Sequence, residues 1–248
     1  MTKTYDYIGI LLSCSDPREF LMSNSNLPGP RSNLELLYAF IEVSRLEMVE
    51  AILEKRYAVT PVNQPEEFVL CCAVAACGKH ILNGNDYLIE KFRDYASDER
   101  WRVRESVAMG LQHIGKFSFE KLRSIVGSWI TGNYYEQRAV AAGLCEPAIL
   151  KGDEIKEYTV STLGEITRQL LLATNRSLPE YKTLVQALCY CWSVAIVAFP
   201  EGGKTLFEEF IPAKEKDLKK ILNENLKKNR LLKMDKPWVE SIVKQINS

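Results

Sequence analysis

The feature of the sequence that most constrains the fold is a pair of amphipathic helices between Asp86 and Gly115. Apolar residues recur at helical spacing, stop at the polar segment 97–100, and resume among small residues. The apolar positions are Leu88, Ile89, Phe92, Tyr95, Val103, Val107, Met109, Leu111 and Ile114. Short helices are marginal in water when isolated, because they gain most of their stability by packing on neighbours. The pair therefore predicts a chain of stacked helices.

The residues that follow repeat this pair at an offset of 33 positions, the separation between Val107 and Val140. Other matched positions are Ala108 with Ala141, Gly110 with Gly143, Leu111 with Leu144, Phe92 with Ile125 and Trp101 with Tyr134. Small residues at the same points of each second helix allow neighbouring pairs to approach closely. A helical solenoid requires such close approach between its repeats.

The repeat resembles a known family in its turn and its second helix. An acidic residue in the turn, Asp98, is followed by Val103–Arg104, Val107–Ala108 and Gly110–Leu111. This order resembles the HEAT repeat, with its acidic turn and its "VR, A, LG" second helix. The resemblance implies an all-α fold, a right-handed superhelical stack of antiparallel helix pairs, as in HEAT/ARM-like α-solenoids.

We expect the whole chain, residues 1–248, to form one such domain. Its expected parts are the repeats 86–117 and 118–150 and a C-terminal cap over 204–248. In the second repeat, Thr131 and Gln137 stand where the family has aspartate and arginine. The sequence therefore does not predict whether polar side chains connect the repeats at this point.

Helical periodicity elsewhere predicts about twelve helices in total, and no alternating pattern predicts a strand. The helices outside the two repeats are expected at 1–13, 18–22, 34–43, 46–57, 66–82, 153–174, 179–198, 204–211 and 217–234, with a short one after Pro237. Residues 199–203 predict a turn, and 23–33 predict a loop. Ser32 and Glu35 have the spacing of a capping box after that loop. At this helix N-terminus, Arg31 and the unpaired main-chain amides would bind an anion. The competing interpretation is an ordinary helix start with no ligand.

The composition is that of an ordinary soluble protein, with 46% hydrophobic and 26% charged residues. Because 32 basic residues balance 32 acidic ones, no global field attracts nucleic acid or a membrane. The apolar runs Ile8–Leu12 and Ala187–Phe199 are too short for a signal peptide or a bilayer span. The seven cysteines mostly lie in apolar helical runs, which indicates reduced core thiols. We expect a cytoplasmic protein without membrane association.

A first candidate contact surface is the cluster around Trp101, which has Arg100, Arg102 and Arg104 beside it. A tryptophan flanked by arginines at a helix start can stack on a nucleobase or on a partner's side chain. The competing interpretation is structural: Trp101 packs on the preceding helix, and Arg104 pairs with an acidic turn residue such as Asp98.

The second candidate surface is a basic face near the C-terminus, formed by Lys219, Lys220, Lys227, Lys228 and Arg230. Such residues neutralise phosphates in nucleic-acid-binding proteins. Solvated lysines that cap the apolar end of a solenoid explain the pattern equally well, because a terminal repeat needs a polar outer face.

Catalysis and metal binding have no strong pattern. Gly203–Lys204–Thr205 resembles the end of a phosphate-binding loop, but the motif needs a glycine where Ala198 stands. Cys77 and His80 lie three apart, and Cys189 and Cys191 two apart, without the four converging donors of a zinc site. His113 has no recognisable catalytic partner. We therefore expect neither a metal nor another cofactor.

A second resemblance is to the bacterial alkylpurine DNA glycosylases built of HEAT-like repeats. Those enzymes use tryptophans and an aspartate on a concave, basic surface. Here Trp101 and Glu105 have the i, i+4 spacing in which a tryptophan and a carboxylate face the same groove, with glutamate as the acid. The leading hypothesis is a non-enzymatic scaffold that binds another protein. The alternative is a DNA-binding protein or alkylated-base glycosylase with Glu105 as the catalytic acid.

Overall fold

The computed structural model of the chain describes residues 2–54 and 61–247. Within these residues it has fourteen helices and no strand, so the all-α prediction is confirmed. The helices are α1 (Thr2–Ser13), α2 (Arg18–Ser23), α3 (Leu34–Val43), α4 (Leu46–Glu54), α5 (Pro65–Leu82), α6 (Leu88–Tyr95), α7 (Trp101–Phe117), α8 (Phe119–Val126), α9 (Tyr134–Leu144), α10 (Asp153–Leu171), α11 (Pro179–Ala198), α12 (Pro200–Glu208), α13 (Lys216–Leu226) and α14 (Asn229–Asn247). The expected continuation of the fourth helix to residue 57 lies outside the described residues.

The predicted capping box of Ser32 and Glu35 is wrong, because α3 begins one residue later than that pair requires. Asn33 is the N-cap, and its Oδ1 accepts the Leu36 N–H at 3.1 Å. Its Nδ2 donates to Tyr7 Oη at 3.1 Å and to the Asn24 main-chain oxygen at 2.8 Å. The Asn33 side chain makes all three bonds at once, because its amide has an oxygen that accepts and an NH₂ group that donates.

Two predicted boundaries near the C-terminus are also wrong. The expected turn over 199–203 shrinks to Phe199, because Pro200 occupies the first position of α12, where a missing N–H costs nothing. The expected single helix over 217–234 ends at Leu226, and α14 begins at Asn229. Within α14, Asp235 has non-helical dihedral angles two residues before Pro237, because proline disrupts the turn that precedes it.

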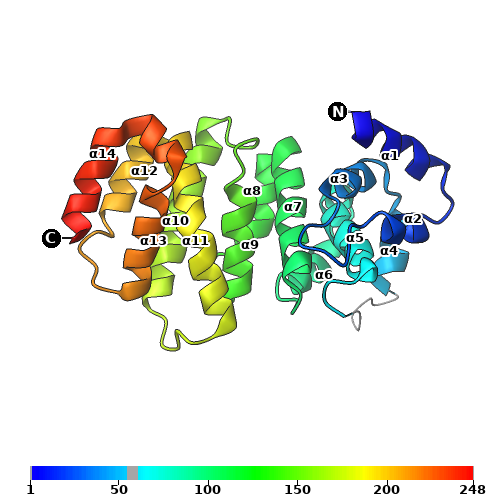
Figure 1. Cartoon of the computed structure of the whole chain (residues 1–248), viewed down its shortest axis with the longest axis horizontal. Helices are drawn as coiled ribbons and strands as arrows, with labels where there is room; N and C mark the ends of the chain where they lie inside the picture. The colour runs from blue at the N-terminus through cyan, green and yellow to red at the C-terminus, as the bar shows by residue number, and fades with distance from the viewer. Residues whose placement is uncertain (1, 55–60, 248) are drawn as a thin grey trace. The chain divides into compact units, whose positions relative to one another are not determined.

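The chain divides into two compact units, Met1–Lys121 and Leu122–Ser248. In the first unit α5 is the central helix, and α3 and α7 both pack against it (Figure 1). All residues from Glu67 to Gly78 are buried, which explains the small and apolar sequence of α5.

The close approach of α5 to α7 depends on two glycines. A Cβ added to Gly78 would lie 2.3 Å from the Gly110 carbonyl oxygen, and one added to Gly110 would lie 2.7 Å from the Phe92 ring. No real Cβ atom tolerates such distances, so both positions need glycine. Small residues thus allow α5 and α7 to approach each other closely.

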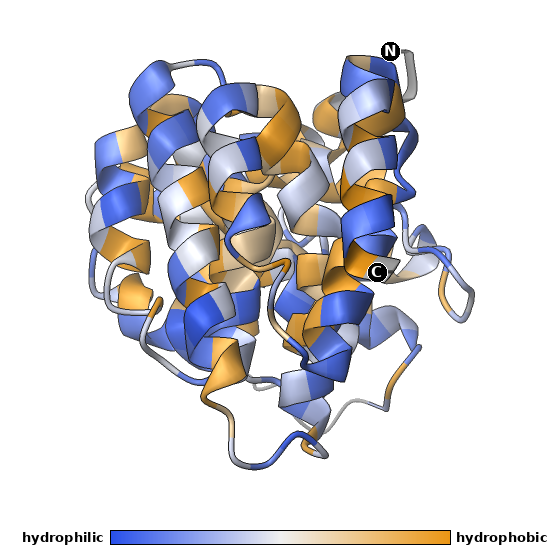
Figure 2. Ribbon diagram, turned by 90° about the vertical axis from the view of Figure 1, so that its left-hand side faces the viewer, coloured by the Kyte–Doolittle hydropathy of each residue, from blue (hydrophilic) through white to orange (hydrophobic). Residues whose placement is uncertain are grey.

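In the second unit α11 lies between α9 and α13 (Figure 1). The buried Asn225 of α13 connects this helix to α11, since it accepts the Ser193 N–H at 2.8 Å and donates to the Leu188 oxygen at 2.8 Å. The C-terminal helix carries both hydrophilic and hydrophobic residues along its length (Figure 2). Its apolar Val239 and Ile242 are buried. Among the described helices, α11 alone has the length and apolar character of a membrane span, and 61% of that window is buried inside the protein.

A polar side chain closes the turn within each of the two predicted repeats. Arg104 Nη1 donates to the main-chain oxygens of Asp98 and Glu99, at 2.5 and 2.9 Å. At the equivalent position, Gln137 Nε2 donates to the oxygens of Ile130 and Gly132, at 3.2 and 3.3 Å. A glutamine amide thus replaces the guanidinium in closing the turn before the second helix.

Candidate binding cleft

The first unit contains a cleft of about 640 Å³. The walls come from α1, the loop before α3, the first turns of α3 and α7, and one residue of α5. The lining residues are Tyr7, Asn26, Pro30, Arg31, Ser32, Asn33, Leu34, Glu35, Leu37, Cys71, Trp101, Arg102, Glu105, Ser106 and Met109. Its volume lies in the range of sites that bind small molecules and cofactors.

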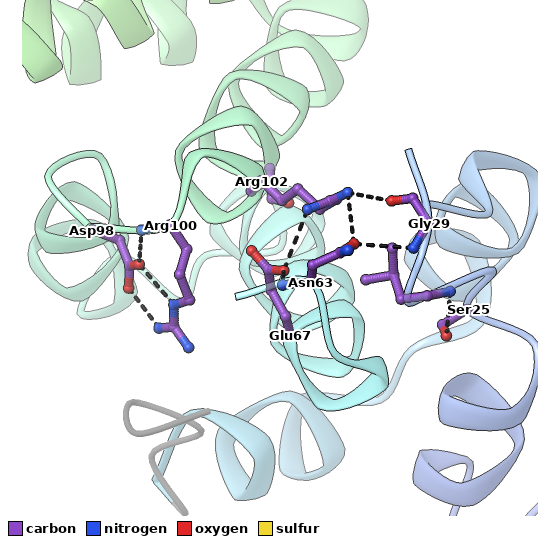
Figure 3. A network of polar contacts seen from close by, with 9 residues as sticks. Ser25, Gly29, Asn63, Glu67, Asp98, Arg100 and Arg102 are labelled. Carbon is purple, nitrogen blue, oxygen red and sulfur yellow. Dashed lines mark hydrogen bonds and ion pairs between the residues drawn. The ribbon is translucent and has the colours of Figure 1, made fainter. Parts of the chain in front are cut away.

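A buried ion pair holds one end of this cleft in place. Arg102 Nη1 lies 3.5 Å from Glu67 Oε2, and both side chains are buried, with 7% and 0% of their surface exposed. Glu67 Oε2 also accepts the Asn63 N–H at 2.7 Å. Figure 3 shows Arg102 reaching from α7 toward Glu67 on α5 and toward the loop at Gly29.

The same arginine fastens the loop that forms a cleft wall. Arg102 Nη2 donates to the Gly29 oxygen at 2.8 Å and to Asn63 Oδ1 at 3.1 Å. Asn63 Oδ1 accepts the Gly29 N–H at 3.1 Å as well. Because Gly29 is held through both of its main-chain polar groups, the loop over 26–33 has a fixed position beside α7.

The structure gives different roles to the three neighbours predicted as contact residues. Trp101 is 50% exposed at the edge of the cleft, whereas Arg102 and Arg104 are buried. Arg104 closes the turn through main-chain oxygens, and the Asp98 carboxylate binds Arg100, with Oδ1 2.8 Å from Nε and Oδ2 2.7 Å from Nη2. Arg102 and Arg104 are therefore positioning residues, and Trp101 is the member of this group that a ligand can contact.

Trp101 and Glu105 line the same cleft, as their i, i+4 spacing predicts. The Arg102 guanidinium carbon lies 4.5 Å from the centroid of the Trp101 ring. A cation at this distance from an indole is attracted by the ring and fixes its orientation. The tryptophan is thus held on one side while half of its surface remains exposed to solvent.

Cys71 in the cleft wall is not a nucleophile. Burial raises the pKa of its thiol to about 12, against a smaller opposing effect from a hydrogen bond with Ser106. The thiolate is the reactive form of cysteine, and at neutral pH this side chain stays protonated. The other side chains that line the cleft are aromatic, apolar, polar and charged.

The basic residues near the C-terminus lie on α13, α14 and the turn between them. Lys219, Lys220 and Lys227 are exposed, and Lys227 Nζ lies 2.7 Å from Glu224 Oε1. Arg230 donates from Nη2 to Tyr190 Oη at 2.6 Å, and Lys228 Nζ lies 6.0 Å from the centroid of the same ring. Part of this charge is therefore used in contacts within the second unit.

The remaining sequence candidates lie in structural surroundings. Gly203 and Lys204 lie inside α12, and Lys204 Nζ is 2.5 Å from Asp235 Oδ2. His80 Nε2 lies 3.2 Å from Ser44 Oγ, and Cys77 Sγ contacts the Ala73 oxygen at 3.4 Å. Six of the seven cysteines, all as free thiols, are buried, as their apolar surroundings predict. In the part of the chain that the structure describes, no three His, Cys, Asp or Glu side chains lie close enough to hold a metal ion.

Sequence reasoning missed the partners of Arg102. Glu67 looks like an ordinary acidic residue in the first turn of a helix, and Asn63 like a loop residue. One feature of the sequence indicated a buried role for Glu67. It lies two residues after Pro65 and directly before a long apolar segment, and a charged side chain so close to a buried helix segment needs a partner.

No protein-family model matches the chain, and no curated protein matches it at a significant level. Among solved structures, the chain is similar to the crystal structure of an engineered protein from the Northeast Structural Genomics Consortium. The two are 16% identical, the match covers 98% of each chain, and the TM-score is 0.36. A likeness at this level carries no argument about function.

Proposed function

We propose that this protein is a non-enzymatic, cytoplasmic HEAT-like scaffold, an α-solenoid whose cleft binds a segment of a partner protein. The architecture is supported by the two helix pairs of the repeats and by the shared contact of Arg104 and Gln137 with the turn before each second helix. Repeat proteins of this kind present extended surfaces to partners.

The observation that carries the proposal is the exposure of Trp101 at the edge of a preformed cleft. Half of the Trp101 side chain is exposed, and exposure of apolar surface to water is unfavourable. A partner that covers the ring would remove this unfavourable free energy. Tryptophan and arginine are the residues most enriched among those that dominate binding at protein interfaces. Because the loop at Gly29 and the guanidinium of Arg102 already fix the cleft, a partner would bind without first ordering it.

Affinity capture with purified protein tests the proposal. Wild type, Trp101→Ala and Tyr87→Ala would be immobilised, and specifically retained proteins identified by mass spectrometry. Tyr87 is the matched control, an exposed aromatic residue of the same unit outside the cleft. We expect a retained partner that Trp101→Ala loses and Tyr87→Ala keeps. Equal retention by all three folded proteins would refute the role of the cleft.

A DNA-binding or base-excising role is the second candidate, and one observation favours it. Trp101 and Glu105 line one cleft, which is the pairing that the glycosylase resemblance requires. This function predicts salt-sensitive binding of a duplex, measured by fluorescence anisotropy, and release of alkylated bases that Glu105→Gln abolishes. Absence of binding at low salt eliminates it, and binding without base release leaves a nucleic-acid-binding module.

A further inference from the structure

Tyr190 of α11 holds two cations on the surface of the second unit. The Arg230 guanidinium carbon lies 4.5 Å from the centroid of the tyrosine ring, and Lys228 Nζ lies 6.0 Å from it. Arg230 Nη2 also donates to Tyr190 Oη at 2.6 Å. Because a ring contact and a hydrogen bond act together, the guanidinium has a fixed orientation. Its other N–H groups have no hydrogen-bond partner within the described residues.

Glu224 of α13 interacts with three lysines beside this ring. Lys227 Nζ lies 2.7 Å from Glu224 Oε1. This hydrogen bond lowers the pKa of the Glu224 carboxyl, and the charges of Lys228 and Lys220 lower it further. Because Lys228 also approaches the tyrosine ring, the two groups belong to one surface. The basic cluster of this surface consists of Lys220, Lys227, Lys228 and Arg230.

The chain around the basic cluster does not balance its charge. Residues 214–236 include nine basic and four acidic residues, whereas the whole chain has 32 of each. Three of the four acidic side chains are already bound within the unit, by Tyr181, Lys227 and Lys204. The cap of a solenoid needs a polar outer face but no excess of one sign of charge. An excess of exposed cations attracts a negatively charged partner.

Two features of the cluster favour an acidic peptide over a nucleic acid. Single strands stack their bases on aromatic rings, but cations already lie against the Tyr190 ring. Proteins that bind duplex DNA contact about 6–10 phosphates in a continuous row. Here Glu224 interrupts a group of only four cations. A peptide carries its carboxylates on separate flexible side chains, which can bind on either side of Glu224.

We propose that the basic cluster binds an acidic segment of a partner protein, with one carboxylate on the N–H groups of Arg230 and others on the exposed Lys220 and Lys227. A planar guanidinium binds a carboxylate through two parallel hydrogen bonds, whereas a lysine acts as a point charge. The cluster belongs to the second unit and the cleft to the first, so this proposal is independent of the function proposed for the cleft.

Fluorescence anisotropy with the purified full chain tests the proposal. The probes are a labelled peptide of alternating glutamate and glycine, the same peptide with glutamine in place of glutamate, and labelled oligothymidine of equal net charge. We expect saturable binding of the glutamate peptide that added salt weakens, and affinity for the glutamine peptide that is lower by about tenfold or more.

Two variants test the guanidinium and its orientation. Arg230→Gln should lower the affinity for the glutamate peptide several-fold, because it removes the planar donor. Tyr190→Phe keeps every charge and removes only the hydrogen bond that orients Arg230. It should lower the affinity by about twofold to fivefold, which corresponds to one hydrogen bond. A surface that attracts peptides by charge alone would not respond to Tyr190→Phe.

A matched pair of double variants tests the lysines. Lys220→Gln/Lys227→Gln should lower the affinity for the glutamate peptide several-fold. Lys151→Gln/Lys182→Gln is the control, because it removes the same charge from exposed lysines of the second unit outside the cluster. The control should leave the affinity nearly unchanged, and circular dichroism would establish that all variants are folded.

Three results would each overturn the proposal. They are equal affinity for the glutamate and glutamine peptides, equal losses in the two double variants, and unchanged affinity in both Arg230→Gln and Tyr190→Phe. Tighter binding of oligothymidine than of the glutamate peptide would assign the surface to nucleic acid instead. Trp101→Ala should leave these affinities unchanged, so this proposal and the function proposed for the cleft fail separately.

Discussion

Arg102 on α7 and Glu67 on α5 form a buried ion pair with 3.5 Å between Nη1 and Oε2, and this pair fixes the loop beside Trp101. The pairing is incomplete, because Glu67 Oε1 and Arg102 Nε have no hydrogen-bond partner within the described residues. A buried pair of this kind contributes less to stability than its charges suggest, because desolvation offsets the attraction.

Removal of one partner of the pair should be more damaging than removal of both. Arg102→Met leaves the Glu67 carboxylate buried without its cation and should lower the free energy of unfolding by about 3–5 kcal/mol. The double variant Glu67→Met/Arg102→Met should recover much of this loss, because it removes both desolvation penalties. Urea unfolding followed by circular dichroism measures the difference. A double variant less stable than Arg102→Met would show that Glu67 stabilises the fold through other contacts, such as the bond that it accepts from the Asn63 N–H.

Gly78→Ala should separate α5 from α7. The new Cβ would lie 2.3 Å from the Gly110 carbonyl oxygen, and backbone atoms cannot move aside cheaply. We expect a loss of about 1–3 kcal/mol from overpacking, despite the better helix propensity of alanine. Gly9→Ala on α1 is the control, because its Cβ would meet nothing within 4 Å and should stabilise the helix by up to about 1 kcal/mol. Thermal unfolding of both variants gives the comparison.

Arg104→Gln should be tolerated better than Arg104→Ala. Gln137 shows that a glutamine amide at this repeat position reaches the turn oxygens, whereas alanine leaves the Asp98 and Glu99 oxygens without this donor. Each lost hydrogen bond costs about 0.5–1.5 kcal/mol, so the two variants should differ by about 1 kcal/mol in chemical denaturation. Equal stability of the two would mean that the contact contributes nothing.

Stability should fall as the pH drops through the range of a free histidine. Burial lowers the pKa of His80, the neighbouring Lys79 lowers it further, and Glu47 and Glu50 oppose the shift. Because the folded protein binds this proton less readily than the unfolded chain, stability is full above about pH 6.5 and declines below it. His113, whose pKa burial also lowers, acts in the same direction.

Unfolding free energies at pH 7.5 and 5.5 test this expectation. His80→Gln, which retains a polar group for Ser44, should show a smaller difference between the two pH values than wild type. Carboxylates such as Asp235, whose pKa a hydrogen bond from Lys204 lowers, contribute only at more acidic pH. An unchanged pH dependence in both His80→Gln and His113→Gln would contradict the assignment.

Local sequence was sufficient for the helices and for most of their ends. The spacing of apolar residues at 3.6 positions predicted the correct first and last residues of α3, and glycine and proline predicted most of the turns. Local sequence was insufficient where the contacts of one side chain determine the N-cap residue. At the start of α3 the N-cap is Asn33, whereas the sequence predicts Ser32. The choice there depends on Tyr7 and Asn24, which lie 26 and 9 residues away.

The sequence by itself determined that the chain is helical and that Trp101 and Glu105 face the same way. These properties follow from spacing along one helix, which local rules describe. Only the tertiary structure decided that Arg102 is buried and that a cleft exists beside Trp101. Both depend on Glu67 and on Gly29, which is 73 residues from Arg102, and such long-range contacts leave no periodic trace in a sequence.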